Sequence, residues 1–223
     1  MTSHADPSRP ATTVFVGDDD DGVRTSLGIL LDSAGYRAVA FASARDFLEQ
    51  YDPARAGCLL LDMRMPGMTG MDLLHELAGR GAFLPVIFIT AHADVPTAVA
   101  AMKTGAVEFL EKPFDREKLL NRVQRALDLD AEWRSQDAQF AALAARIAVL
   151  NERDRETLQM IQAGESNKAM AAKLFISERA VEMRRSSLMK KLQVSSVAEL
   201  IDLTSTHRIL AELNNLKSSQ SLR

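Results

Sequence analysis

Short apolar runs alternate with longer segments of helical periodicity over the first 125 residues. Five runs have the composition and length of buried strands: 12–17, 38–41, 59–62, 85–90 and 107–110. The segments between them carry apolar residues every three or four positions, as Val23, Leu27 and Leu31 do after the first run. This alternation predicts a parallel sheet with helices on both faces. We therefore expect an α/β domain of the flavodoxin-like (βα)5 type over residues 12–125.

The helical pattern does not stop where this domain should end. No Gly or Pro occurs between Leu119 and Gly164, and apolar residues repeat every seven positions over about three and a half heptads. The repeat consists of Ala126, Trp133, Phe140 and Ile147, followed three positions later by Leu129, Gln136, Leu143 and Leu150. We predict a long connecting helix, with a linker over 126–149. Two interpretations stay open: a dimerising signalling helix, or one amphipathic helix that packs on its own domains.

Residues 150–214 show the start and stop signals of four helices, which predicts an all-α domain. The expected N-caps are Asn151, Ser166, Ser177 and Ser196. The second helix (167–174) and the third (177–192) are joined only by a tight turn at Phe175 and Ile176, as in a helix-turn-helix. We expect the last helix to end near Thr206.

Composition and charge indicate two parts of different character. No apolar run approaches the roughly 20 residues of a membrane span, and the single cysteine, Cys58, cannot form an internal disulfide. Residues 1–129 carry 13 basic and 18 acidic residues, whereas residues 150–223 carry 12 and 9. The rear part therefore suits an anionic partner. We expect a cytoplasmic bacterial protein without a membrane partner, with a disordered tail at 1–11 and a flexible one at 215–223.

Polar side chains with complementary chemistry follow four of the predicted strands. They are Asp18 and Asp19 after the first, Asp62 at the end of the third, Thr90 at the end of the fourth and Lys112 after the fifth. In the flavodoxin-like strand order these strands are neighbours, and their carboxyl ends form one pocket. Each residue alone has an ordinary explanation as a helix cap or a solvated loop side chain. Their occurrence together predicts a phosphoryl-transfer site.

The residue types of this pocket suggest a role for each member. Clustered carboxylates need a hard cation, and oxygen ligands in this number suit Mg²⁺. The expected ligands are Asp18, Asp19, Asp62 and the backbone carbonyl of Arg64. Asp62 is also the expected nucleophile, which becomes an aspartyl-phosphate. Lys112 and Thr90 are expected to bind phosphoryl oxygens, and the Lys112–Pro113 bond is a candidate cis peptide.

Four segments carry these residues: 16–20, 61–70, 89–91 and 108–114. They resemble the receiver domain of two-component response regulators, over about residues 12–129. The resemblance implies phosphorylation of Asp62 by a histidine kinase and, at most, slow self-dephosphorylation, so we do not expect an enzyme. It also implies a switch in which the Thr90 hydroxyl moves toward the phosphoryl group and the Phe109 ring turns inward. Gly17 departs from the family pattern, which usually has a bulkier apolar residue there.

The predicted helix-turn-helix carries side chains suited to DNA. The second helix of such a motif enters the major groove with its early residues toward the bases. The candidates for base contacts are Glu178, Arg179, Glu182, Arg185, Ser186 and Met189, with Ser177 at the start of the helix. The candidates for phosphate contacts are Lys168, Arg184, Lys190 and Lys191. The paired cations could equally form a solvated helix face, and charge alone does not indicate DNA.

Segments of the rear part also match a family pattern: 150–158, 163–168, 176–177, 180–182 and 189–192. They resemble the LuxR-type helix-turn-helix, and the whole chain is similar to the FixJ/NarL class of response regulators, the FixJ branch most closely. Ala180 and Arg184 stand where a Thr and a His are usual. These departures affect the expected target sequence and not DNA binding itself.

The hypothesis from the sequence is a response-regulator transcription factor controlled by phosphorylation of Asp62. The partners that it implies are a histidine kinase, double-stranded DNA, RNA polymerase and, in the phosphorylated state, a second copy of the chain. Three alternatives stay open. A pseudo-receiver would be a constitutive DNA-binding protein, and an RNA-binding output would prefer RNA to duplex DNA. An aspartate-dependent phosphohydrolase would need a second Asp where Arg64 stands.

Overall fold

The computed structural model describes residues 12–91 and 95–220, with side chains up to Leu213. The predicted tail at 1–11 and positions 221–223 lie outside these residues. The chain forms two compact units, one that runs to Arg134 and one from Ser135 to Asn215. In the described part of the chain, no helix combines the length and the apolarity that a membrane crossing requires.

The first unit is built on a five-stranded parallel sheet with the order β2-β1-β3-β4-β5. Its strands are β1 (Thr13–Gly17), β2 (Arg37–Phe41), β3 (Gly57–Asp62), β4 (Val86–Thr90) and β5 (Glu108–Glu111). The expected fold class is confirmed, and the carboxyl ends of β1, β3, β4 and β5 are neighbours. Gly17 pairs with Phe41 on one side and with Leu61 on the other. A Cβ at Gly17 would lie 3.0 Å from Leu61 Cδ1, so its small size fits the close packing at this strand end.

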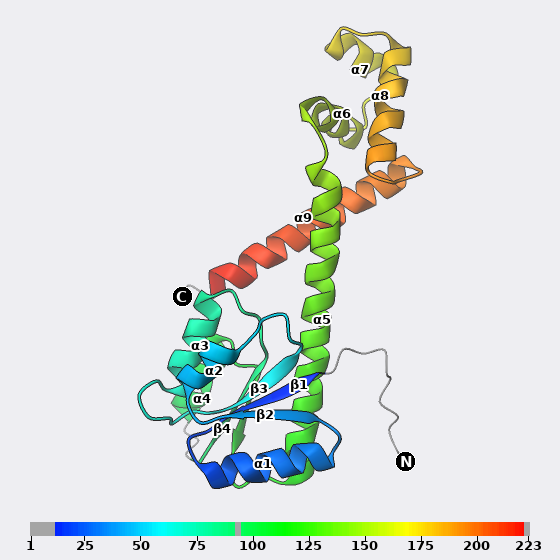
Figure 1. The fold of residues 1–223 in the computed structure, drawn as a ribbon. Helices are drawn as coiled ribbons and strands as arrows, with labels where there is room; N and C mark the ends of the chain where they lie inside the picture. Colours follow the sequence, from blue (N-terminus) through cyan, green and yellow to red (C-terminus); the bar gives the residue numbers. More distant parts are fainter. Residues whose placement is uncertain (1–11, 92–94, 221–223) are drawn as a thin grey trace. The chain divides into compact units, whose positions relative to one another are not determined.

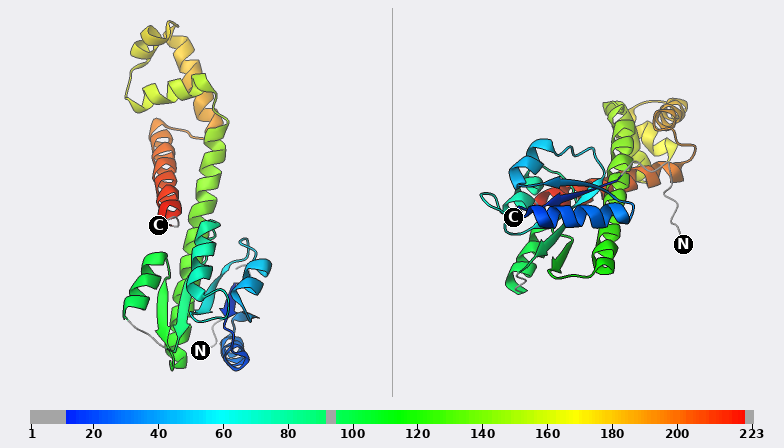
Figure 2. Two further views of the ribbon diagram at one scale, coloured as in Figure 1. Left: turned by 90° about the vertical axis from the view of Figure 1, so that its left-hand side faces the viewer. Right: turned by 60° about the horizontal axis from the view of Figure 1, so that its bottom comes forward.

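Helices cover both faces of this sheet (Figures 1 and 2). They are α1 (Asp21–Ser33), α2 (Ala44–Gln50), α3 (Gly70–Gly79), α4 (Val95–Thr104) and α5 (Arg116–Ala148). Helices α2, α3 and α4 pack on the face that carries Phe15 and Phe88, whereas α1 and α5 pack on the face that carries Val14 and Leu60. Because both faces are covered, a ligand can reach the sheet only at the ends of its strands.

Two residues of α5 tie this helix to the amino end of the sheet. Asp130, which is 1% exposed, accepts hydrogen bonds from the backbone N–H of Gly57 at 2.9 Å and from Arg134 Nε. Arg134 also donates to the backbone carbonyls of Ala54 and Arg55. These contacts hold α5 on the first unit well beyond the domain end expected from the sequence.

The heptad positions of α5 contact residues of their own chain. Trp133 packs edge-on against Phe83 with a ring-centroid distance of 6.5 Å, and Phe140 stacks on His207 at 5.3 Å. Ile147 packs against the core of the second unit. The predicted long helix is confirmed. Its contacts favour the interpretation in which α5 packs on its own domains.

The second unit adds four helices to the end of α5, as expected. They are α6 (Glu152–Gln162), α7 (Asn167–Leu174), α8 (Glu178–Lys191) and α9 (Val197–Gln220). The predicted end of the last helix near Thr206 is wrong, because α9 continues to Gln220 and includes positions 215–220 of the expected flexible tail. No Gly or Pro interrupts residues 207–220, and Leu210 is buried, so nothing in this stretch ends the helix.

Candidate functional site

Two carboxylates and one ammonium group meet at the carboxyl end of the sheet. Lys112 Nζ lies 2.8 Å from Asp18 Oδ2 and 3.1 Å from Asp62 Oδ1. The exposed side-chain fractions of Lys112, Asp18 and Asp62 are 24%, 5% and 12%, so the group is largely shielded from water. The strand order explains why these three side chains lie close together, because β1, β3, β4 and β5 lie side by side. The structure thus brings together three of the predicted site residues.

Each carboxylate uses its second oxygen for a local backbone contact. Asp18 Oδ1 accepts a hydrogen bond from the N–H of Asp20 at 3.0 Å, and Asp62 Oδ2 accepts one from the N–H of Arg64 at 2.6 Å. Asp20 is in turn the N-cap of α1 and accepts from the N–H of Val23. The two carboxylates are therefore oriented by the chain before any ligand binds, with one oxygen of each toward Lys112.

The backbone also fixes Lys112. Its N–H donates to the carbonyl of Thr90 at 2.8 Å, and the Lys112–Pro113 peptide is cis, as expected from the sequence. Burial works against the charged ammonium, but the hydrogen bonds to Asp18 and Asp62 outweigh it and raise the pKa of Lys112. The side chain is therefore a permanent positive charge at neutral pH.

The residues expected to hold a metal ion are only partly gathered. Asp18 and Asp62 share the pocket, whereas Asp19 and Arg64 are exposed. Among the described residues, no three His, Cys, Asp or Glu side chains are arranged as a ready metal site. This differs from the expected carboxylate cluster, because the Lys112 ammonium contacts both shielded carboxylates and neutralises one of their two charges. The donor chemistry still fits a hard divalent ion, since Asp18 and Asp62 carry two negative charges against the single charge of Lys112, and Asp19 adjoins Asp18 in the sequence.

The two expected switch residues lie on the neighbouring strands β4 and β5. Thr90 ends β4 and is 2% exposed. Phe109 pairs with Phe88 in the sheet register and is partly buried against the cluster that includes Ala101 of α4. Phe109 therefore connects the strand that leads to Lys112 with the face covered by α4.

In the second unit, α7 and α8 form the predicted helix-turn-helix. Ser166 caps α7 by accepting a hydrogen bond from the N–H of Ala169, and Ser177 caps α8 in the same way with Ala180. The turn between the helices contains Phe175 in the left-handed conformation, with φ of 56°, and its side chain is 94% exposed. This conformation ends α7 and lets α8 begin three residues later.

Three cations of α8 have partners inside the second unit. The pairs are Arg185 with Asn167 (2.9 Å), Arg184 with Glu156 (3.8 Å) and Lys191 with Asp154 (2.6 Å). Burial disfavours the charged form of Asp154, but hydrogen bonds from Lys191 and the Asn151 N–H outweigh it and lower the pKa of Asp154. These contacts fix α8 on α6 and α7, which is a structural role beside any contact with DNA.

The other candidate DNA-binding residues face solvent or line one hollow. The exposed ones are Lys168, Ser177, Glu178, Arg179, Glu182, Ser186 and Lys190. A hollow of about 400 Å³ includes Asn167 of α7 and five of the candidates on α8: Glu182, Arg185, Ser186, Met189 and Lys190. Their spacing of three or four positions places them on one face of α8.

Sequence models of two protein families match the chain. The one described as the response regulator receiver domain matches residues 14–124, and the one described as the luxR family of bacterial regulatory proteins matches residues 148–204. The chain is 44% identical over 188 residues to the transcriptional regulatory protein FixJ of Azorhizobium caulinodans, with 84% of this chain and 89% of the relative covered. The chain belongs to the FixJ-like response regulators.

Further relatives of this response regulator cover almost its whole length. Nodulation protein W of Bradyrhizobium diazoefficiens is 40% identical over 208 residues, which are 93% of this chain and 91% of the relative. The solved structure of response regulator StyR matches with a TM-score of 0.81 and 43% identity, over 87% of this chain and 98% of that one. Full-length FixJ from B. japonicum matches with a TM-score of 0.55 and 37% identity, over 90% and 99%. The protein is thus a transcriptional regulator with a receiver and a LuxR-type DNA-binding domain.

One residue that shapes the receiver pocket of this response regulator was not identified from the sequence. Gly70 follows the N-cap Thr69 at the start of α3, and its N–H donates to the Met63 carbonyl at 3.1 Å. A Cβ at Gly70 would lie 2.3 Å from the backbone oxygen of Asp62. Only glycine therefore allows α3 to approach the loop that follows Asp62. The signal in the sequence was a glycine at the first position of the helix, directly after the N-cap Thr69.

Proposed function

We propose that this response regulator accepts a phosphoryl group on Asp62 and that phosphorylation controls its binding to DNA. The observation that carries the proposal is the pair of contacts from Lys112 Nζ to Asp18 and Asp62 at the open edge of the sheet. Phosphoryl transfer depends on positioning and charge balance more than on other covalent chemistry. A fixed carboxylate beside a fixed ammonium supplies both.

The transfer is a displacement at phosphorus. An oxygen of Asp62 attacks the phosphorus of a phosphohistidine on the kinase, and an O–P bond forms as the P–N bond breaks. The electron pair of the P–N bond stays with the imidazole nitrogen, which takes up a proton. The Lys112 ammonium and the Thr90 hydroxyl bind phosphoryl oxygens. Slow attack by water on the aspartyl-phosphate returns the chain to its starting state.

The residues that would hold Mg²⁺ are Asp18, Asp19, Asp62 and the carbonyl of Arg64. When bound, the ion would supply positive charge that lowers the repulsion between the attacking carboxylate and the phosphoryl group. The support for this assignment is the charge at the pocket, where the ammonium of Lys112 neutralises only one of the two charges of Asp18 and Asp62.

An apolar cavity beside the pocket suits the approach of the histidine kinase. It has a volume of about 410 Å³ and is lined by α1 residues, among them Val23, Leu27 and Leu30, and by Pro113 and Phe114 after Lys112. An amphipathic helix that carries a phosphohistidine can place its apolar face here and its phosphoryl group toward Asp62. We therefore assign the kinase to this face.

Phosphorylation reaches the output through the two switch residues. The Thr90 hydroxyl moves toward the phosphoryl group, the Phe109 ring turns inward, and the face formed by α4 and β5 changes shape.

The chain then forms dimers on paired half-sites in double-stranded DNA, in the bacterial cytoplasm. The exposed residues of α8, with Glu178, Arg179 and Glu182 foremost, read the major groove, and Lys168 and Lys190 bind phosphates. Contact with RNA polymerase converts binding into a change of transcription.

The test is labelling by acetyl phosphate with Mg²⁺. Asp62→Asn keeps the shape of the side chain and removes the nucleophilic oxygen, so labelling is abolished. The matched control is Asp52→Asn, an exposed position that leaves labelling unchanged. Labelling of the Asp62→Asn variant at the wild-type level would reject the assignment. Labelling that leaves the affinity for duplex DNA unchanged would favour the constitutive DNA-binding alternative.

A further inference from the structure

The C-terminal end of α8 is closed by a local backbone motif. The N–H of Gln193 donates to the Lys190 carbonyl at 3.1 Å, and the N–H of Val194 donates to the Met189 carbonyl at 3.0 Å. Gln193 has a φ of 51°, which completes a Schellman motif. Two of the last carbonyls of α8 therefore accept backbone hydrogen bonds. The carbonyl of the C-cap residue, Leu192, accepts a hydrogen bond from a side chain of another helix.

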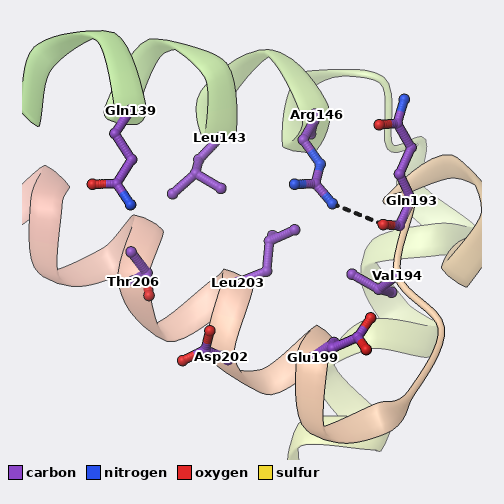
Figure 3. A pocket seen from close by; sticks show the side chains of 9 residues that line it. All are labelled: Gln139, Leu143, Arg146, Gln193, Val194, Glu199, Asp202, Leu203 and Thr206. Carbon is purple, nitrogen blue, oxygen red and sulfur yellow. Dashed lines mark hydrogen bonds between the residues drawn. The ribbon is translucent and has the colours of Figure 1, made fainter. Parts of the chain in front are cut away.

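That side chain is Arg146, in the last turn of α5. Its Nη2 donates to the Leu192 carbonyl and, at 3.2 Å, to the Gln193 carbonyl, the second of which is drawn in Figure 3. Leu192 is 0% exposed and lies in the core of the second unit, so its carbonyl depends on a partner from the chain. The guanidinium also places positive charge at the negative end of the α8 dipole.

The side chain of Arg146 reaches α8 although carboxylates line the same cavity. The cavity has a volume of about 290 Å³, and Glu199 and Asp202 of α9 lie on the wall opposite α5 (Figure 3). The guanidinium nevertheless points to the backbone at the end of α8. Its Nε is buried and has no hydrogen-bond partner among the described residues. Because a buried N–H without a partner is unfavourable, Arg146 gives up one hydrogen bond in this arrangement.

We propose that Arg146 is a positioning residue for DNA recognition, which ties the last turn of α5 to the end of the DNA-reading helix. The inference rests on the proposed function of α8. Arg146 binds the end of α8 that is farthest from Ser177 and Glu178, so it acts through the helix and not on the bases. Lys191 and Arg185 fix α8 to α6 and α7, and Arg146 adds the polar tie from α5.

The experiment measures duplex affinity of full-length variants treated with acetyl phosphate and Mg²⁺. The probe is a duplex selected from a random pool by the wild-type protein. Arg146→Gln weakens binding about tenfold, the equivalent of one charge-assisted hydrogen bond. The slope of log affinity against log salt stays the same, because no phosphate contact is lost. Arg146→Lys keeps the charge and one donor, so its affinity lies between the two.

The matched control is Arg155→Gln. Arg155 also donates to a backbone carbonyl, that of Leu150 at 3.2 Å, but it does not contact the end of α8. This variant loses the same charge and keeps the wild-type affinity. An equal loss in both variants would show that net charge alone matters, and would overturn the inference.

Other outcomes also decide the question. A folded Arg146→Gln variant with wild-type affinity would overturn the inference, and so would a salt slope that falls by about one, the sign of a direct phosphate contact. If the Gln variant does not fold, Arg146→Lys carries the test: the expected result is weaker binding with faster amide exchange over residues 189–194, and wild-type affinity would count against it. Wild-type protein that binds no duplex at all would instead reject the proposed function.

Discussion

At the scale of single residues, the receiver pocket depends on the charge of Lys112. Its pKa is raised in the folded state above the ordinary value of 10.5. A raised pKa means that the stability from this group is fully present below the ordinary value and is lost as the pH rises through the folded value. The contacts with Asp18 and Asp62 therefore persist across the whole neutral range and weaken only in strong alkali.

Replacement of this lysine by an apolar side chain should make the pocket depend on added cations. In Lys112→Met, Asp18 and Asp62 lose the ammonium that offsets one of their two charges, so we expect a lower unfolding midpoint than in the wild type. Mg²⁺ should raise the midpoint of the variant more than that of the wild type, because the ion replaces the missing charge. Thermal unfolding with and without Mg²⁺ checks this. Equal shifts in both proteins would show that the ion does not bind between these carboxylates.

The size of one side chain also decides how α3 meets the pocket. Gly70→Ala places a Cβ against the Asp62 carbonyl, 2.3 Å away before relaxation. We expect a loss of about 2 kcal/mol in the free energy of unfolding, the range for overpacking, together with slower labelling of Asp62. Gly28→Ala is the control, since a Cβ in the middle of α1 meets nothing within 4 Å. Urea unfolding of both variants measures the difference, and equal stabilities would contradict the close approach.

At the scale of elements, α5 is held to the sheet by a buried ion pair. Asp130→Ala leaves the Gly57 N–H and the Arg134 guanidinium without their acceptor, so the free energy of unfolding should fall by about 3 kcal/mol. Asp128→Ala is the matched control, because Asp128 is exposed on the same helix and accepts a hydrogen bond from the exposed side chain of Gln124. Urea unfolding compares the two. A loss in Asp130→Ala no larger than that in the control would mean that the pair does not anchor α5.

The elements that could be predicted from the sequence are those with local signals. The strands around Leu60 and Phe88 are unbroken apolar runs, and α3 and α6 each begin with a capping box at Thr69 and Asn151. The pocket residues could be assigned because a parallel sheet brings its carboxyl ends to one edge. The positions of Asp62 and Lys112 followed from the strand pattern, and the likeness to receiver domains implied the switch roles of Thr90 and Phe109.

The features that could not be predicted depend on contacts between distant segments. Nothing near Asp130 in the sequence indicates that it accepts from Gly57, and nothing near Arg146 points to Leu192. The heptad pattern of α5 fitted both a dimerising helix and a helix that packs on its own domains, because the spacing of apolar residues does not show which surface they contact. The full length of α9 was missed for a related reason, since capping rules mark where a helix starts more clearly than where it ends.

At the scale of the whole molecule, the front and rear parts of the sequence carry opposite net charge. Residues 1–129 have 18 acidic and 13 basic residues, and residues 150–223 have 9 and 12. The receiver therefore adds no affinity for the phosphate backbone of DNA, and non-specific binding falls to the rear unit. Any effect of the receiver on DNA binding therefore acts through a change in the populations of states, monomer and dimer included, and not through contacts of the receiver itself with DNA.

Such control is a coupling free energy, and coupling is reciprocal. Beryllium trifluoride with Mg²⁺ mimics the phosphoryl group on Asp62 and binds reversibly, so both affinities can be measured. We expect the mimic to tighten duplex binding about 5- to 150-fold, the usual range of coupling between two sites. The duplex should then tighten binding of the mimic by the same factor.

The affinity for the mimic is measured by titration with and without duplex, followed by the fluorescence of the single tryptophan, Trp133. Asp62→Asn should remove both effects. Factors of one in both directions would mean that the receiver does not command the DNA-binding domain, whereas unequal factors would show that a further equilibrium, such as dimer formation, is linked to the two.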